Sequence, residues 1–226
     1  MHRLRHNDML KRPWQLLIVA TVAIGVLPAS YVRADDDEQR ASHEGRAHHP
    51  SVLGAELHIG AVLPFVDVLC PASDAGGRSA CLLNEGIGVG GSVERRWEFG
   101  GALVLGYDMS FLSGSGVYEV GVLQTLRVGA KWVVPLSTAL KPYFEVSAGA
   151  LLFGDSFTIA TAGGSLQFGF GGELEFAENL ALIGGIVFRG FSTGSFISPN
   201  DMVARGSDPG ANLAIIMQLG VLYLED

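Results

Sequence analysis

Ionisable side chains recur at alternate positions along much of the chain, and their types could support chemistry. Paired carboxylates, or a carboxylate beside a histidine such as His58, are the groups that general acid–base catalysis uses. The candidates are Glu56, His58, Glu94, Asp108, Glu119, Arg127, Glu145, Glu173, Glu175 and Arg189. Three interpretations stay open: an ion-pair network that fills an interior, a narrow path for ions or solutes, and hydrolysis. We favour the network, because charges in a poorly solvated interior must find partners.

A glycine-rich stretch at 86–91, GIGVGG, matches the spacing GxGxxG of dinucleotide-binding sites. That motif works only between a strand and a helix whose N-terminus faces the phosphates. Here the stretch lies inside an alternating segment and is followed by Glu94, Arg95 and Arg96. We therefore predict no nucleotide site and interpret the glycines as relief of crowding in a narrow interior.

The N-terminus has the three parts of an export signal. A basic start is followed by an apolar core over residues 14–29 and by Val32-Arg33-Ala34, which fits signal peptidase. We predict a signal peptide over residues 1–34, cleaved after Ala34. The alternative is an uncleaved anchor helix, but the core is short for a span of about 20 residues. Pro28 also argues against a continuous helix there.

Net charge and cysteine content bear on the compartment and the partners. The whole chain has a formal net charge of −8, and residues 1–34 hold more basic than acidic side chains, so the exported part is more acidic still. This argues against nucleic acid as a partner. Cys70 and Cys81 are predicted to pair in an oxidising compartment. A metal pair or a reactive thiol is the alternative, although neither cysteine has a neighbouring histidine or a CxxC spacing.

The rest of the chain separates into a leader and an alternating region. Residues 35–50, DDDEQRASHEGRAHHP, have no apolar period and are predicted to be a disordered acidic, histidine-containing leader. From 51 to 226 the period is two, the period of a β-strand. In the first segment Leu57 and Ile59 share one face, while Glu56 and His58 share the other. Eight such segments predict about eight strands.

The two faces of these segments differ in a way that predicts the surroundings of the sheet. One face is almost wholly apolar, and the other carries glycines, small residues and sparse charges. A soluble sandwich would place many Lys, Thr and Ser on its outer face. A narrow lumen explains the small residues, and a hydrocarbon solvent explains the apolar face. Closure is required because an open sheet edge in lipid would leave backbone groups unpaired.

Connection lengths and aromatic positions give an independent prediction of topology. The gaps between segments are 67–84, 95–97, 111–116, 133–141, 154–163, 177–179 and 190–210, and most of the length falls on alternate gaps. This indicates long extracellular loops at one rim, tight turns at the other, and both termini in the periplasm. The predicted rim aromatics are Trp97, Phe99, Trp132, Tyr143, Phe144, Phe176 and Tyr223 on the periplasmic side, and Tyr107, Phe111, Tyr118, Phe153, Phe157, Phe188 and Phe191 on the outer side.

From about Val52 to Asp226 the pattern resembles the small OmpA/OmpX-type outer-membrane barrels and, more loosely, porin-family barrel domains. The segments that carry the resemblance are KPYFEVSAGALLF at 141–153, FAENLAL at 176–182 and ANLAIIMQLGVLYL at 211–224. The resemblance implies an all-β, closed antiparallel transmembrane barrel in the outer membrane of a Gram-negative cell. In that family the last strand usually finishes on an aromatic residue, whereas this chain ends Tyr223-Leu224-Glu225-Asp226.

These observations predict a structural or surface-interaction barrel whose lumen is filled by side chains, with no catalysis, no cofactor and no metal site. The alternative is a narrow porin-like channel or a solute-binding barrel. The expected partners are outer-membrane lipid and lipopolysaccharide, the barrel-assembly machinery during insertion, and an extracellular ligand bound through the loops at 67–83, 154–163 and 190–210. Nucleic acid is not among them.

Overall fold

The computed structural model describes residues 51–67, 69, 82–113, 117–198, 200, 202–206 and 211–225. The predicted signal peptide over 1–34, the predicted leader over 35–50 and the predicted pair Cys70 and Cys81 lie outside the described residues. Within the described ranges no helix is long and apolar enough to cross a membrane.

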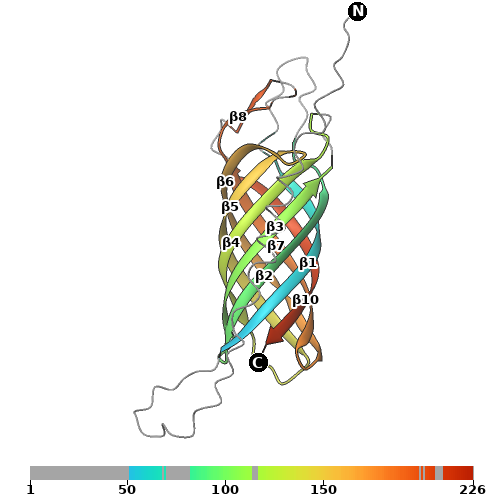
Figure 1. Ribbon diagram of the computed structural model, residues 1–226, viewed down its shortest axis with the longest axis vertical. Coiled ribbons are helices and arrows are strands. Elements are labelled where there is room, and N and C mark those ends of the chain that lie inside the picture. The colour runs from blue at the N-terminus through green and yellow to red at the C-terminus, as the bar shows by residue number, and fades with distance from the viewer. Residues whose placement is uncertain are drawn as a thin grey trace, which may run out of the picture. The chain divides into compact units, whose positions relative to one another are not determined.

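Eight long strands close into an antiparallel barrel (Figure 1). They are β1 (Ser51–Val66), β2 (Gly86–Trp97), β3 (Gly101–Leu112), β4 (Gly121–Val133), β5 (Leu140–Asp155), β6 (Thr158–Ala177), β7 (Leu180–Thr193) and β10 (Asn212–Glu225). Around the barrel the order is β1-β10-β7-β6-β5-β4-β3-β2, and the pairing of β10 with β1 closes it. Two short strands, β8 (Phe196–Ile197) and β9 (Ala204–Arg205), pair within the β7–β10 connection. The predicted barrel of about eight strands is confirmed.

The barrel has two unlike ends. At the loop end, where Figure 1 labels β8, the connections run over 67–85, 113–120, 156–157 and 194–211. At the turn end they run over 98–100, 134–139 and 178–179, and both barrel termini lie there. The predicted alternation of longer and shorter connections therefore holds for three of the four loop-end connections.

The fourth loop-end connection corrects the prediction of a long loop over 154–163. Strands β5 and β6 continue through this range and meet in a two-residue turn at Ser156 and Phe157. Both turn residues have positive φ, 43° and 72°, which suits the twist of a two-residue hairpin. The glycines at 154, 163 and 164 interrupt the apolar alternation, yet their backbones still pair across the sheet.

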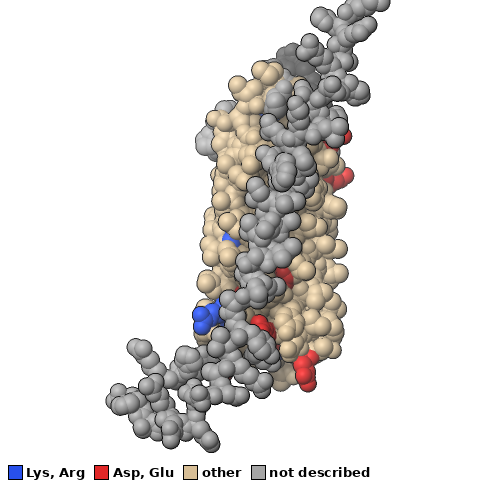
Figure 2. All heavy atoms as spheres, viewed as in Figure 1, with Lys and Arg blue, Asp and Glu red and all other residues tan. Residues whose placement is uncertain are grey.

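The outward surface of the barrel is apolar. Large side chains on it are freely exposed, among them Leu57 at 75% and Leu166 at 68%. The visible surface in Figure 2 is mostly uncharged, with few acidic or basic side chains. Soluble monomers rarely expose apolar patches beyond a few hundred Å². A surface of this kind is what contact with acyl chains requires.

Aromatic rings line the turn end, but part of the predicted girdles lies inside. Trp97 stacks on Phe99 with ring centroids 6.0 Å apart, and Phe99 lies 5.7 Å from Trp132. Four predicted rim aromatics are instead buried, 1–4% exposed: Tyr118, Tyr143, Phe153 and Phe191. The three in strands occupy odd positions of β5 and β7, which face inward, and Tyr118 precedes β4 rather than lying in it.

Candidate functional site: the interior of the barrel

Glycines on the inward face make room for the charged side chains of neighbouring strands. Gly90 of β2 pairs with His58 on one side and Asp108 on the other. A Cβ at Gly90 would lie 2.5 Å from Asp108 Oδ1 and 2.5 Å from His58 Nε2. At Gly106 a Cβ would lie 2.9 Å from Arg127 Cζ. Only glycine therefore fits beside the charges at these two positions without displacing them.

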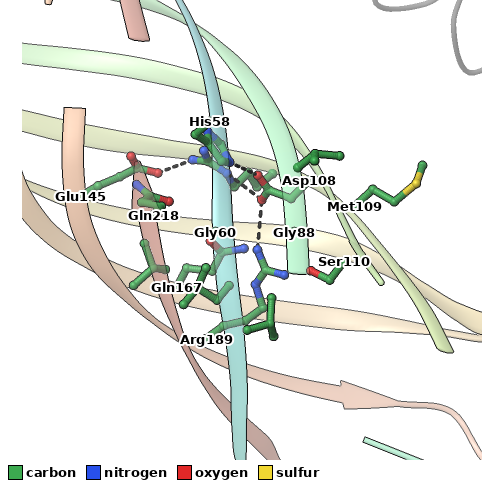
Figure 3. A pocket seen from close by; sticks show the side chains of 15 residues that line it. His58, Gly60, Gly88, Asp108, Met109, Ser110, Glu145, Gln167, Arg189 and Gln218 are labelled. Atoms are coloured by element: carbon green, nitrogen blue, oxygen red, sulfur yellow. Dashed lines mark hydrogen bonds and ion pairs between the residues drawn. The ribbon is translucent and has the colours of Figure 1, made fainter. Parts of the chain in front are cut away.

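A central cluster, defined as Glu56, His58, Asp108, Arg127, Glu145, Gln167 and Arg189, is organised around Asp108. Both ring nitrogens of His58 contact carboxylates: Nε2 lies 3.0 Å from Asp108 Oδ1, and Nδ1 lies 3.0 Å from Glu56 Oε1. Arg127 Nε donates to Asp108 Oδ2 at 3.1 Å, and Arg189 Nη2 donates to the same oxygen at 3.0 Å. Figure 3 shows Asp108 between His58 and Arg189.

The edges of the central cluster extend the same pattern of pairing. Arg127 also donates through Nη1 to Glu145. With the amide of Gln167 turned so that its oxygen faces Arg189, that oxygen accepts from Nε at 3.1 Å and from Nη2 at 3.3 Å. Three carboxylates thus face two guanidinium groups and one imidazole. Removing any single charged member would leave a buried partner uncompensated.

A second group of charges, the turn-end cluster, consists of Glu94, Arg96, Lys131 and Glu173. Lys131 Nζ lies 3.1 Å from Glu94 Oε2 and 2.6 Å from Glu173 Oε1. Arg96 donates to both oxygens of Glu173 at 2.9 Å each and also to Glu94. The side chains of Lys131 and both glutamates are 1% exposed. Two cations and two carboxylates therefore balance in a dry setting.

Tyr143 packs above this second cluster. Its ring lies 4.7 Å from Lys131 Nζ, a cation–π distance, and its hydroxyl accepts from Gln218 Nε2 at 3.3 Å. Gly171 and Gly185 leave space for that hydroxyl, since a Cβ at either position would lie 2.8 Å or 2.5 Å from it. The phenol therefore reaches from β5 over the neighbouring backbones of β6 and β7 to Gln218 of β10.

The loop-end half of the interior is filled differently. Here apolar side chains from strands and loops form one buried cluster, the apolar cap: Val62, Leu69, Leu82, Leu83, Leu112, Tyr118, Leu123, Leu151, Phe153, Val187, Phe191, Phe196, Ala214 and Ile216. The five that come from connections between strands, such as Leu69 and Leu82, are buried against strand side chains such as Leu151. The loops therefore close over the interior by apolar contact.

Two aspartates tie the loops down. Asp67 accepts from the backbone N–H of Leu69 at 2.7 Å and of Leu83 at 3.1 Å, joining the two ends of one loop. Burial raises the pKa of the Asp67 carboxyl, and the two N–H donors oppose that rise. Asp155 accepts from the N–H groups of residues 119 and 120, from the Ser156 hydroxyl and from Asn200, so one carboxylate links three connections.

One small cavity lies where the central cluster meets the apolar cap. It measures about 20 Å³, and its lining includes His58, Asp108 and Arg189 on the polar side and Val62, Val187 and Ile216 on the apolar side. A cavity of this size has room for about one water molecule. Figure 3 shows the lining residues converging on it from several strands.

The structure brings together eight of the ten residues that the sequence predicted for a polar interior, and a ninth, Glu175, pairs with Lys141 outside both clusters. Glu56, His58, Asp108, Arg127, Glu145 and Arg189 lie in the central cluster, and Glu94 and Glu173 lie in the turn-end cluster. Glu119 is a correction: it is exposed and precedes β4, which begins at Gly121. The Asp155 carboxylate holds its backbone N–H in the loop, so the residue never enters the alternating strand.

Sequence reasoning missed Lys131 and Arg96, which complete the turn-end cluster. The signal was available, because both positions continue the inward parity set by Arg127 and Glu94 in the same strands. The glycine-rich stretch at 86–91 lies inside β2 and pairs with a strand on each side. Its predicted position within an alternating strand is confirmed.

Comparisons with known proteins bear on the fold. No protein-family model matches the sequence, and no curated protein matches it. Among solved structures, Neisserial surface protein A (NspA) is 12% identical with a TM-score of 0.50, over 76% of this chain and 96% of that one. Outer membrane protein AlkL is 10% identical with a TM-score of 0.44, over 84% and 97%. A de novo designed transmembrane β-barrel is 18% identical with a TM-score of 0.41, over 77% and 95%.

Closed topology, an apolar exterior and the similarity to NspA point to one architecture. The barrel has eight antiparallel strands whose inward side chains are polar or small through much of its length. The chain has the fold of the small outer-membrane β-barrels, the OmpA/OmpX type that its sequence resembles.

Proposed function

We propose that this protein is a structural or surface-interaction barrel of the outer membrane, with a lumen occluded by its own side chains and with no catalytic activity. Its exposed loops would contact lipopolysaccharide or an extracellular ligand. The observation that carries the proposal is the filling of the interior: two balanced charge clusters and an apolar cap leave a cavity of about 20 Å³ between them.

Burial of the charges supports occlusion rather than conduction. A hydrated pore would expose its lining charges to water, whereas the side chains of Glu94, Lys131 and Glu173 are each 1% exposed. Ions crossing the turn-end cluster would have to break contacts of 2.6 to 3.1 Å between fully desolvated partners. Eight-stranded barrels have interiors just wide enough for side chains to fill.

Planar-bilayer recording tests the occlusion. Wild-type protein is expected to give no steady single-channel current, and Lys131→Met is expected to leave that result unchanged wherever the variant folds. Insertion of the protein is verified separately by protease protection in the same lipid. Persistent openings of the wild type, with an ion selectivity that Lys131→Met alters, would support the narrow channel instead.

Location and orientation have their own test. We propose that the loop end faces the cell exterior and that both barrel termini face the periplasm, in keeping with the longer connections at the loop end. An epitope inserted in connection 113–120 should be detected on intact cells. The matched insertion at 134–139, in the turn end, should be detected only after the outer membrane is permeabilised. The reverse pattern would contradict the orientation.

The absence of catalysis is proposed on the state of His58. A serine hydrolase needs a hydroxyl on one ring nitrogen of its histidine, but both nitrogens of His58 contact carboxylates, Glu56 and Asp108. Mass spectrometry of membrane lipids with and without expression should show no deacylated products. Products that appear with the wild type and vanish in His58→Ala would overturn this part of the proposal.

A further inference from the structure

One nitrogen of the central cluster is left over once the contacts described above are assigned. Arg189 is 3% exposed, and its Nη2 and Nε are accounted for by Asp108 and Gln167. Its Nη1 has no hydrogen-bond partner among the described residues. A buried guanidinium N–H without an acceptor destabilises the folded state, because the group has lost its hydrogen bond to water and gained none in return.

The same guanidinium lines the cavity of about 20 Å³. In Figure 3 it and the hydroxyl of Ser110 point toward one another across this space. Ser110 is 2% exposed, and the neighbouring wall is formed by Gly88, where a Cβ would lie 3.5 Å from Ser110 Oγ. The space is thus bounded by a donor, by a hydroxyl that can donate or accept, and by a glycine that keeps it open.

We propose that this cavity is a binding site for one small uncharged hydrogen-bonding molecule, water, which accepts from Arg189 Nη1 and donates to Ser110. Size supports water, since a cavity of this volume holds one. Charge supports a neutral occupant, because the carboxylates that line the cavity, Asp108 and Glu145, already pair with the guanidinium groups of the same lining and leave no full charge to compensate. The bound molecule completes the central cluster and joins it to the wall of the apolar cap.

Gly88→Ala tests the proposal, because an empty cavity and a water-filled cavity predict effects of opposite sign on the stability of the barrel. The new methyl meets only ordinary van der Waals neighbours, at 3.5 to 3.6 Å, and enters the cavity. If the cavity is empty, filling it should stabilise the barrel. If it holds the proposed water, the methyl displaces it, strands Arg189 Nη1, and should lower the folded-to-unfolded ratio about fivefold or more. Urea unfolding of the detergent-purified protein measures this ratio.

Gly164→Ala is the matched control, because its Cβ meets only the Gly149 carbonyl oxygen at 3.8 Å and points away from the lumen. It should leave the ratio unchanged or raise it, as alanine has the lower folding entropy cost. A Gly88→Ala protein that is as stable as Gly164→Ala or more so would overturn the proposal.

A crystal structure of the wild-type protein provides the second, independent readout. The expected result is one density peak within about 3.2 Å of both Arg189 Nη1 and Ser110 Oγ. No peak would overturn the proposal. So would an anomalous bromide signal at this position after chloride is exchanged, because it would identify the occupant as an anion.

Discussion

The two halves of the barrel interior are both dry but differ in the groups that fill them. A charged cluster lies at the turn end beside a small apolar one (Val133, Tyr143, Ala181, Ile183 and Leu222), and the apolar cap fills the loop end. At the turn end, Lys131 and its two glutamates are 1% exposed and held by ion pairs. At the loop end, Leu151 and Phe153 are 0% and 1% exposed and held by apolar contact. The same wall of alternating strands surrounds both. Burial alone therefore does not determine which kind of side chain fills a narrow lumen.

The two halves should differ in how well they tolerate substitutions of their buried side chains. An apolar side chain that is shortened costs the lost contact area and the cavity left behind, but it leaves no charge without a partner. A charged side chain that is removed leaves partners that cannot return to water. The turn-end cluster should therefore respond to single substitutions more strongly than the cap, and it should respond to paired substitutions in a way that the cap cannot.

Lys131→Met should give the largest effect. It leaves Glu94 and Glu173 sharing only Arg96, and a broken buried pair typically costs about 3–5 kcal/mol of unfolding free energy. Urea unfolding in detergent micelles measures the loss. Adding Glu173→Gln leaves Arg96 and Glu94 as a balanced pair and should recover at least half of it. A double variant no more stable than the single one would show that charge balance does not hold this half together.

Leu151→Ala tests the apolar cap by the same measurement. Its side chain is fully buried, so its loss should cost about 2–4 kcal/mol through lost contacts and a residual cavity. No second substitution that changes charge should rescue it. Recovery on adding a charge change in the turn-end cluster would mean that the two halves are one coupled unit.

Gly90→Ala sharpens the comparison within the charged half. The methyl would lie 2.5 Å from atoms of both Asp108 and His58, so these side chains must shift, at a cost of about 1–3 kcal/mol. The matched lipid-facing change Gly164→Ala meets no such neighbour and should cost nothing. Equal stabilities of the two variants would contradict the account of glycine in the lumen.

Asp155→Ala should give the smallest effect on the barrel. Its hydrogen bonds join connections outside the sheet, so the unfolding free energy should fall by about 1 kcal/mol or less. The loops around residues 119 and 200 should nevertheless be cleaved faster in limited proteolysis of the folded protein. Unchanged cleavage rates would show that the apolar cap alone holds these loops.

Much of this architecture follows from the alternation of apolar with small or polar side chains, which has a period of two residues. Alternation assigned Leu57 and Glu94 to opposite faces, and glycine on one face with aliphatic residues on the other indicated a closed barrel. Alternation also places Lys131 and Arg96 inward, but it does not say which charges meet, because partners such as Glu173 come from strands far apart in sequence.

Strand ends were the least predictable part. Around Gly154 the apolar alternation breaks while backbone pairing continues, so a predicted loop is a hairpin. Near Tyr118 and Glu119 the alternation continues while pairing has not begun, so a predicted strand is a loop. Side-chain pattern reports which solvent a residue meets, whereas strand ends depend on hydrogen bonds from residues such as Asp155.

Tryptophan fluorescence in brominated lipid tests most directly the claim that acyl chains surround this barrel. A chain beginning at Asp35 contains only Trp97 and Trp132, both at the turn end among exposed aromatic rings. After folding into vesicles, bromines near the lipid carbonyls should quench these tryptophans more strongly than bromines at the chain ends. Fluorescence that no brominated lipid quenches, but that aqueous iodide quenches fully, would contradict the account.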